Sequence, residues 1–253
     1  MSEPITFYDM PHKGFEQASE SENCWSPNNW KTRYALNIKG LKYKTEWLGF
    51  AAVEPKMKEL GLGAHASGAI KYTVPTIYDP KTKKVVTESF EIAKYLDEAY
   101  PDTPRLVAPG TAGLQQAFLE KVAGPLIGAA FPIICFPVYE KCCMNEADEK
   151  LFRTTREAWF GGKKLEDIGP KGEALAEACK AFGGQLDGIA KIVAANGSSS
   201  VFIGGDAPSH CDTAVGAILT CVLRILGKDG ELSKVILGHE WASKFLQAMS
   251  KWE

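Results

Sequence analysis

A serine stands at the start of a predicted helix near the beginning of the chain. The stretch "WSPNN", residues 25–29, is typical of a turn, and helical spacing begins directly after it at Trp30. Serine before a helix and proline at its first position are common at helix starts, so Ser26 is a candidate cap. The same geometry leaves N–H groups near Asn28 and Asn29 without helical partners at the positive end of the helix dipole. An anion fits there, and a thiolate beside Ser26 would have a lowered pKa.

Two later residue pairs offer contacts for an extended, charged ligand. In "YTVPT", a cis bond before Pro75 would free the backbone of Val74 to pair with such a ligand, although X–Pro bonds are trans by default. Glu88 and Ser89 fall where a strand ends and a helix begins. Ser89 can act as a plain cap, or the pair can bind an ammonium through the carboxylate and a carboxylate through the hydroxyl and free N–H groups. The second interpretation describes a site for an amino-acid zwitterion.

The first hundred residues predict a small α/β domain that positions these groups. Alternating apolar and polar residues favour strands, and glycine or proline marks the ends of the helical segments. The predicted strands are Ile5–Asp9, one within 41–50, and a hairpin of 76–79 and 84–87; the predicted helices end at Gly40, run from after Pro55 to Gly61, and run from Ser89 to before Pro101. The expected order is β-α-β-α-β-β-α.

The rest of the chain predicts helices only. A segment rich in Pro, Gly and Thr, residues 103–113, is a predicted linker between a domain of residues 1–102 and an all-α domain of residues 114–253. Ser209 and Asp212 have the spacing of a helix capping box, so we expect both to be structural.

The stretch from Val122 to Tyr139 contains no charged residue and is about long enough to span a bilayer. Pro125, Pro132 and Pro137 each remove a helical donor and clash with the preceding turn. We therefore expect a kinked pair of core helices here and no membrane span.

The composition excludes several function classes. The 253 residues include 29 basic and 31 acidic side chains, with a net charge of -2, so no electrostatic signature of nucleic-acid or acidic-membrane binding is present. The first residues lack the apolar core of a secretory signal, and seven cysteines without framework spacing favour a reducing, cytoplasmic location. The four histidines form no metal-ligand pattern, so no metal is expected. "GLGAHASG" lacks the spacing of a dinucleotide-binding fingerprint.

The order of the serine, the Val–Pro pair and the Glu–Ser pair resembles the N-terminal domain of glutathione transferases, which is thioredoxin-like. The all-α remainder is similar to the second domain of that family. The stretches "SPNNWKTRYALNIKGLKYKTEWL", "YTVPTIYDPKTKKVVTESFEIAKYLDEAYPDTP" and "FRTTREAWFGGKKLED" resemble the fungal, etherase-related group, a serine-type, fungal-specific class A. The resemblance thus covers both domains.

The resemblance implies glutathione as co-substrate and a role for each candidate residue. Ser26 takes the position of the catalytic Ser or Cys. The glutathione-binding residues are then Val74 and Pro75 at the cysteinyl backbone, Glu88 and Ser89 at the γ-glutamyl end, Asn28 at the helix start, and one of Lys56, His65 and Lys71 at the glycyl carboxylate. The choice among these three stays open at this point. Phe131, Pro132 and Phe136 are expected to line the pocket for a hydrophobic electrophile.

The implied function is detoxifying conjugation, or peroxide reduction, by a cytoplasmic homodimer. Thiol–disulfide exchange is disfavoured because it needs an enzyme sulfur, and Ser26 has none. The alternatives are glutathione-dependent aryl ether cleavage, non-catalytic binding of aromatic or phenolic molecules, and a structural module that retains the fold alone. Cys24, two residues before Ser26, is either a spectator or a thiol that exchanges with glutathione.

Overall fold

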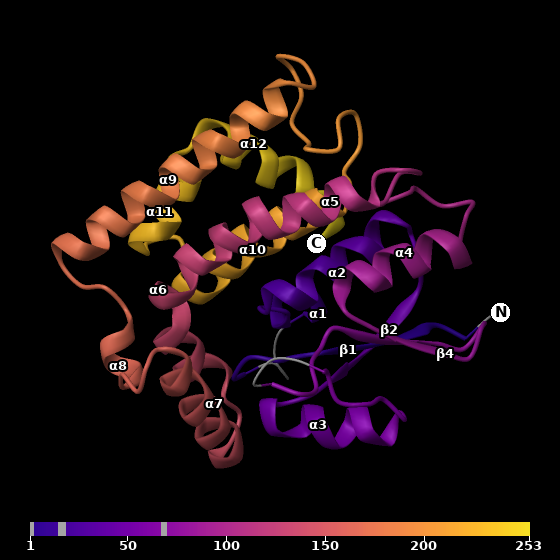
Figure 1. The fold of residues 1–253 in the computed structure, drawn as a ribbon, viewed down its shortest axis with the longest axis horizontal. Helices are drawn as coiled ribbons and strands as arrows, with labels where there is room; N and C mark the ends of the chain where they lie inside the picture. The colour runs from indigo at the N-terminus through magenta and orange to yellow at the C-terminus, as the bar shows by residue number, and fades with distance from the viewer. Residues whose placement is uncertain (1–2, 15–18, 67–69) are drawn as a thin grey trace.

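The computed structural model describes residues 3–14, 19–66 and 70–253, which form a small α/β domain followed by a larger helical domain (Figure 1). The α/β domain is built on a mixed sheet of four strands in the order β2-β1-β3-β4. The strands are β1 (Ile5–Asp9), β2 (Tyr43–Trp47), β3 (Thr76–Asp79) and β4 (Lys84–Thr87). Strand β1 pairs in parallel with β2 and antiparallel with β3, and β3 pairs antiparallel with β4.

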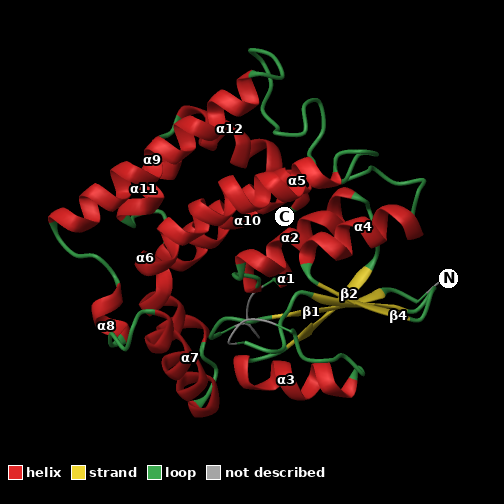
Figure 2. Ribbon diagram, viewed as in Figure 1, coloured by secondary structure: helices red, strands yellow, loops and turns green. Residues whose placement is uncertain are grey.

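Helices cover both faces of this sheet (Figure 2). Helices α2 (Pro27–Ile38) and α4 (Ser89–Ala99) lie on one face, α3 (Phe50–Glu59) lies on the other, and α1 (Glu20–Asn23) is a short turn before α2. All of β1 is buried, including its polar residues Thr6 and Asp9. The alternation seen in its sequence therefore does not mark an exposed face. The predicted thioredoxin-like domain is confirmed.

The helical domain is packed around one buried helix, α10 (His210–Leu226), and the described residues after Thr87 contain no further named strand. Its other helices are α5 (Ala112–Phe118), α6 (Gly124–Cys142), α7 (Glu146–Trp159), α8 (Leu165–Ile168), α9 (Glu173–Ala194), α11 (Glu231–Gly238) and α12 (Glu240–Met249), with the short segments η2 (Leu119–Ala123) and η3 (Ser250–Trp252). The predicted all-α second domain is confirmed. The boundaries 1–102, 103–113 and 114–253 stay a prediction, and α5 already begins inside the predicted linker.

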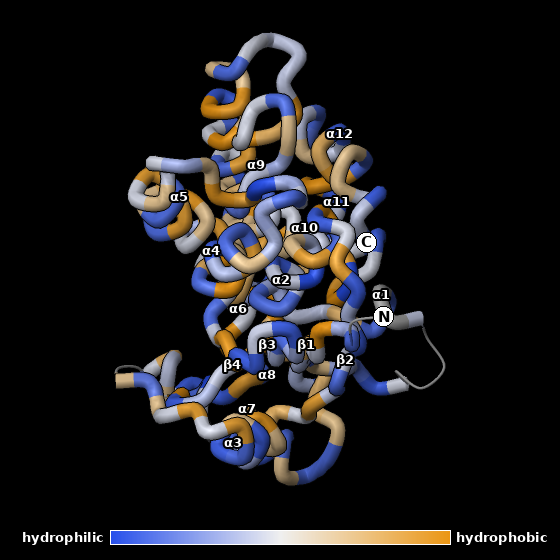
Figure 3. The backbone as a smooth tube through the Cα atoms, turned by 90° about the vertical axis from the view of Figure 1, so that its right-hand side faces the viewer, coloured by the Kyte–Doolittle hydropathy of each residue, from blue (hydrophilic) through white to orange (hydrophobic). Residues whose placement is uncertain are grey.

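The two domains meet where α10 packs on α2. Figure 3 shows the layers in order, from α3 through the sheet and α2 to α10. The hydroxyl groups of Tyr34 and Thr220 lie 2.9 Å apart across this contact. Gly216 faces Tyr34 so closely that an added Cβ would lie 3.4 Å from its ring. This packing fixes the helical domain over the α2 side of the sheet.

The start of α10 carries the capping box that its sequence predicts. The Asp212 carboxylate accepts the backbone N–H of Ser209 at 2.8 Å and its hydroxyl at 2.9 Å. It also accepts the N–H groups of Ile203 and Gly204 at 2.6 and 2.9 Å. These four bonds satisfy a carboxylate with no exposed surface, so the structural interpretation of Ser209 and Asp212 is confirmed.

Helix α3 begins earlier than the sequence predicts. It starts at Phe50, and Pro55 lies inside it. The reason is a tertiary contact, since the buried Asp148 carboxylate of α7 accepts the N–H of Ala51 at 2.8 Å and so caps the helix from the other domain. Gly49 permits this approach, because an added Cβ would lie 2.6 Å from Asp148 Oδ2.

The expected kinked pair of helices between Val122 and Tyr139 is wrong. One continuous helix runs from Ala112 to Cys142, with a single π-helical turn, η2, just before Pro125. The N–H of Gly124 bonds to the carbonyl of Leu119, five residues back. A wide turn of this kind shifts the hydrogen-bond register so that the proline interrupts the ladder without ending the helix.

Within the described residues, this is the one helix long and apolar enough to cross a membrane by length and composition. The mean hydropathy of its apolar window is 1.8, and 33% of that window is buried. Its inner side contacts α8, α9 and α10. In this fold its buried side packs against the other helices of the second domain.

Candidate functional site

Ser26 lies at the N-cap position of α2, with Pro27 as the first helical residue. Its carbonyl accepts the N–H of Trp30 at 2.9 Å, as a cap residue does. Its side chain, however, makes no capping hydrogen bond, and the residue is 6% exposed. The sequence allowed the Ser26 hydroxyl to act as a plain helix cap, and in the structure it does not. A buried hydroxyl at a helix start, not engaged in capping, is available to a ligand.

A buried ion pair fixes the first turns of α2 to the end of β1. The Asp9 carboxylate accepts Arg33 Nη2 at 3.0 Å, Asn29 Nδ2 at 2.5 Å and the N–H of Met10 at 2.6 Å. Asp9 has no exposed surface and Arg33 is 1% exposed. This network was not predicted from the sequence, although an acid that closes an apolar strand and an arginine inside a buried helix are its signals. The network holds Ser26 in a set position relative to the sheet.

Cys24 lies in the same buried layer and is a spectator. It has no exposed surface, and its pKa is raised well above the ordinary value, first by burial and then by the nearby Asp9 charge. A protonated, inaccessible thiol does not attack a disulfide. The structure therefore does not favour the exchange of Cys24 with glutathione.

The bond between Val74 and Pro75 is cis, as considered from the sequence. The two residues lie just before β3, and Val74 is 8% exposed. Asn28, in the first turn of α2, is exposed, and its side-chain oxygen accepts Lys31 Nζ at 3.0 Å.

Glu88, and not Ser89, occupies the N-cap position of α4. Its backbone has a φ of 72°, a conformation that non-glycine residues rarely adopt. Such residues cost about 1–3 kcal/mol and gather at binding and active sites. The Glu88 side chain makes no capping bond and is exposed, while Ser89 is the first residue of the helix. The prediction that Ser89 caps the helix is therefore wrong. The unusual backbone of Glu88 makes Glu88 and Ser89 candidates for contact with a ligand.

The three candidates for a carboxylate donor lie in different surroundings. His65 Nε2 lies 2.8 Å from Thr73 Oγ1 and 3.5 Å from Glu88 Oε1, so His65 joins the Glu88 end of the site. Lys56 Nζ forms ion pairs at 3.0 Å with Glu46 and 3.1 Å with Glu59.

The third candidate, Lys71, is exposed, and its carbonyl accepts the N–H of His65 at 2.8 Å. The structure thus places His65 next to Glu88. Lys56 lies between two carboxylate partners.

A buried histidine links the Glu88 end to the helical domain. His210 begins α10, has no exposed surface, and its ring centroid lies 5.2 Å from that of Phe90. Burial, with a contribution from the Lys31 charge, lowers its pKa to about 3.

This shift predicts an acid-sensitive fold. His210 stays neutral in the folded chain but takes up a proton near pH 6.5 when unfolded, so stability is lost as the pH falls below that value. The loss reaches about 2 kcal/mol at pH 5. Urea unfolding at pH 7 and pH 5 measures it. Because the difference between the two pH values should shrink by that amount in the His210→Gln variant, an unchanged difference would contradict this assignment.

Aromatic rings connect the Ser26 region to the helical domain. Starting from Trp25, next to Ser26, successive ring centroids lie 5.9 Å apart to Phe50, 5.1 Å to Phe152, 6.2 Å to Tyr139 and 6.1 Å to Phe136.

A second group of rings lies further along α6 and α7. The Phe131 centroid lies 6.1 Å from that of Trp159 and 6.0 Å from that of Phe160. Phe131, Pro132 and Phe136, the predicted pocket residues, are all half-buried on α6. Phe131 therefore contacts the rings at the end of α7, and Phe136 joins, through Tyr139, the run of ring contacts that reaches Trp25 next to Ser26.

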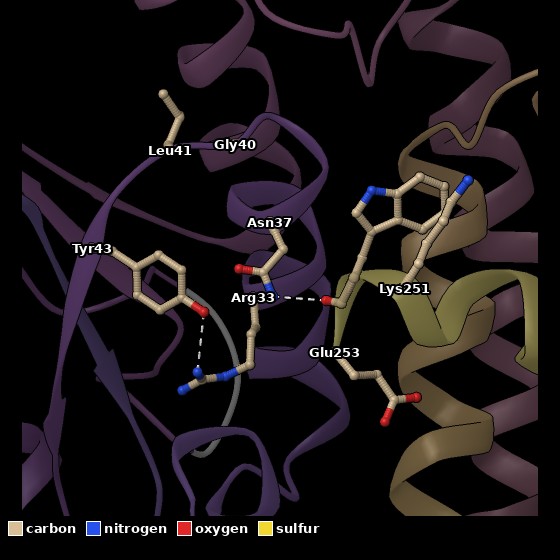
Figure 4. Close-up of a pocket in the computed structure, with 8 residues that line it drawn as sticks. Arg33, Asn37, Gly40, Leu41, Tyr43, Lys251 and Glu253 are labelled. Carbon is tan, nitrogen blue, oxygen red and sulfur yellow. Dashed lines mark hydrogen bonds between the residues drawn. The ribbon is translucent and has the colours of Figure 1, made fainter.

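Two cavities are described, and Ser26 lines neither of them. One of about 420 Å³ lies between the C-terminal half of α2, the start of β2 and the chain end (Figure 4). Here Arg33 Nη1 donates to the Tyr43 hydroxyl at 3.1 Å, and Asn37 Nδ2 donates to the Trp252 carbonyl at 2.7 Å. The other, of about 450 Å³, lies between α3 and α7 around Gly49 and Asp148. Among residues 3–14, 19–66 and 70–253, no group of three or more His, Cys, Asp or Glu side chains is placed to hold a metal ion.

The protein combines a thioredoxin-like domain, which has a cis-proline before β3 and a serine at its first long helix, with an all-α second domain. This combination defines a class of thiol-binding two-domain proteins. Comparison with known families agrees. Residues 25–99 match the model of the glutathione S-transferase N-terminal domain, and residues 113–252 match that of the C-terminal domain. The chain belongs to the glutathione S-transferase family.

Several fungal proteins are similar along nearly the whole chain. Glutathione transferase GSTFuA3 from Phanerochaete chrysosporium is 34% identical with a TM-score of 0.88, and the match covers 100% of this chain and 98% of that one. CsGST63524 of Ceriporiopsis subvermispora, solved in complex with glutathione, is 35% identical with a TM-score of 0.89, over 99% and 98% of the two chains. The glutathione S-transferase-like protein ustS of Aspergillus flavus is 29% identical over an alignment of 224 residues, and the match covers 83% of this chain and 76% of that protein.

Proposed function

We propose that the protein is a glutathione transferase that activates the glutathione thiol at Ser26. The observation that carries this proposal is the buried Ser26 hydroxyl, which stands at the start of α2 without a capping bond. A thiolate placed beside it receives one hydrogen bond from the hydroxyl and the favourable field of the helix terminus.

The tripeptide extends from Ser26 past Val74 to Glu88 and Ser89. The backbone of Val74 pairs with the cysteinyl unit, the Glu88 carboxylate binds the γ-glutamyl ammonium, and the Ser89 hydroxyl with the first N–H groups of α4 binds its carboxylate. The unusual φ of Glu88 and the lack of a capping bond from its exposed side chain support this assignment. The glutathione complex of CsGST63524, 35% identical to this chain, also supports it.

The energetic requirement on Ser26 is modest. A free thiol has a pKa of roughly 8.5, and lowering it by about two units needs about 2.7 kcal/mol of differential stabilisation of the thiolate. A charge-assisted hydrogen bond contributes roughly 1.5–3 kcal/mol and a helix terminus about 0.3–1 kcal/mol. The two together are sufficient at near-neutral pH.

The thiolate attacks an electrophile held against the aromatic rings of α6 and α7, including Phe131 and Phe136. Conjugation and glutathione-dependent peroxide reduction are the favoured reactions, because a serine cannot form the mixed disulfide of an exchange reaction. Cleavage of aryl ethers is the alternative reaction, in line with the proposed place of this chain in the etherase-related fungal group. Detoxification, a homodimeric state and a cytoplasmic location complete the proposal.

Non-catalytic binding of aromatic molecules is a second candidate. It is favoured by the partly exposed rings around Trp159, which is 48% exposed. Binding of phenolics without consumption of glutathione would favour it over the transferase.

The test is a panel of glutathione reactions with a chloronitrobenzene, an isothiocyanate, a hydroperoxide and a β-aryl ether, combined with retention on a glutathione resin. Retention together with turnover of at least one electrophile is expected. Retention without any turnover would leave only the binding function, and flow-through of folded protein would refute glutathione recognition itself.

A further inference from the structure

Arg156 of α7 is a cation without a carboxylate partner among the described residues. Its neighbour on the same helix, Arg153, pairs with Glu157 at 2.8 Å and with Glu166 at 2.8 Å. Arg156 forms no such ion pair within the described part of the chain. Its one described side-chain hydrogen bond runs from Nη1 to Thr155 Oγ1 at 2.8 Å, and its Nε is buried without a partner. A guanidinium has five N–H donors, so most of its bonding capacity is unused.

Aromatic rings surround this guanidinium. Its central carbon lies 4.2 Å from the ring centroid of Trp159, 4.6 Å from that of Phe152 and 5.8 Å from that of Phe50. These contacts orient the planar group without neutralising it. Burial lowers the Arg156 pKa to about 10, which shows how poorly its charge is solvated.

The position of Arg156 connects it to the proposed reaction site. Phe50 contacts Trp25, whose neighbour in the chain is Ser26, and Arg156 lies over the Phe50 ring. On its other side, Trp159 is 48% exposed and contacts Phe131 of α6. The guanidinium thus lies within a run of ring contacts that leads from Trp25, the neighbour of Ser26 in the chain, to the exposed Trp159.

We propose that Arg156 is the specificity-determining residue of the acceptor site and that it selects aromatic electrophiles carrying a carboxylate. An unpaired guanidinium fork fits a planar carboxylate with two parallel hydrogen bonds, and the flanking rings fit the aromatic body of such a molecule. This inference rests on the proposed function, because it names the substrate class of the same site.

A suitable probe pair is 4-chloro-3,5-dinitrobenzoate and its uncharged amide, which differ little in shape. In the reaction the thiolate sulfur forms a bond to the ring carbon, the carbon–chlorine bond breaks, and chloride leaves with the bonding electrons. The thiol proton passes to solvent, and no oxidant or reductant is needed. The carboxylate takes no part in the bond changes, but it activates the ring less than the amide does, so the comparison uses KM and not the rate.

The test compares wild type with Arg156→Gln and with the matched control Arg153→Gln. The wild type should show a KM for the carboxylate about tenfold or more below that for the amide, the effect of roughly one charge-assisted bond pair. Arg156→Gln should bring the two KM values together, mainly by raising that for the carboxylate, and Arg153→Gln should keep the preference. Arg156→Lys, which retains the charge without the fork, should keep a smaller preference.

A binding experiment separates this inference from the proposed function. Calorimetry with the unreactive pair 3,5-dinitrobenzoate and 3,5-dinitrobenzamide needs no turnover and no glutathione. Tighter binding of the carboxylate by the wild type, lost in Arg156→Gln, supports the inference even where the panel shows no reaction. Equal binding of the two probes by the wild type overturns it whether or not the protein is an active transferase, and needs no variant to fold.

Discussion

We expect the Ser26→Ala variant to conjugate glutathione about 10- to 100-fold more slowly than the wild type below neutral pH, since it loses one charge-assisted hydrogen bond to the thiolate. The fold should survive, because the Ser26 side chain makes no capping bond and its carbonyl still accepts the N–H of Trp30. Steady-state rates with a chloronitrobenzene measure the effect.

The pH dependence of the Ser26→Ala rate identifies the cause of the slower reaction. In the proposed mechanism Ser26 lowers the pKa of bound glutathione, so its removal should raise that pKa, and the rate deficit should shrink as the pH rises through roughly 8.5, where the free thiol ionises. Ser26→Thr, which keeps the hydroxyl, is the control and should retain most of the rate. An ultraviolet titration that finds the same thiol pKa in wild type and Ser26→Ala would contradict the proposed role of Ser26.

The largest effect on stability is expected from Asp97→Ala, about 3–5 kcal/mol less free energy of unfolding. Asp97 of α4 accepts Lys39 Nζ at 2.6 Å and the N–H groups of Leu106 and Val107 at 3.1 and 2.8 Å. The Lys39 side chain has no exposed surface, so loss of the carboxylate leaves a buried, uncompensated cation. Leu106 and Val107 lead into the helical domain, and their N–H groups would lose a partner as well.

Urea unfolding measures this loss, and a double variant tests its origin. Asp97→Ala combined with Lys39→Met removes both charges and should be more stable than Asp97→Ala alone, because the penalty for an unpaired buried cation disappears. A loss below about 1 kcal/mol for Asp97→Ala would show that the pair contributes no more than an exposed ion pair does.

The sequence predicted those elements whose signals are local. Alternation marked β1, the turn at residues 80–83 marked the β3–β4 hairpin, proline marked the start of α2, and the capping box marked the start of α10. Each of these features depends on residues within a few positions of one another, and each is present in the structure.

The predictions from the sequence were wrong where distant residues or an irregular turn determine the bounds of a helix. Helix α3 starts at Phe50 because Asp148, nearly a hundred positions later, caps it. The long helix through Pro125 continues because a π-helical turn absorbs the proline, and propensity alone does not foresee such a turn.

The residues of the candidate site likewise include some that the sequence predicts and some that it does not. Ser26, the cis Val74–Pro75 bond and the Glu88–Ser89 pair could be found from motif order. The Asp9–Arg33 ion pair joins β1 to α2 across 24 positions and was not found, and the unpaired Arg156 depends on packing against Phe50 of the other domain.

A crystal structure of the protein with glutathione tests the central claim most directly. We expect the sulfur within hydrogen-bond distance of Ser26 Oγ, the cysteinyl backbone paired with Val74, and the γ-glutamyl group between Glu88 and Ser89. Glutathione bound elsewhere, or with its sulfur away from Ser26 in an otherwise occupied groove, would contradict the account.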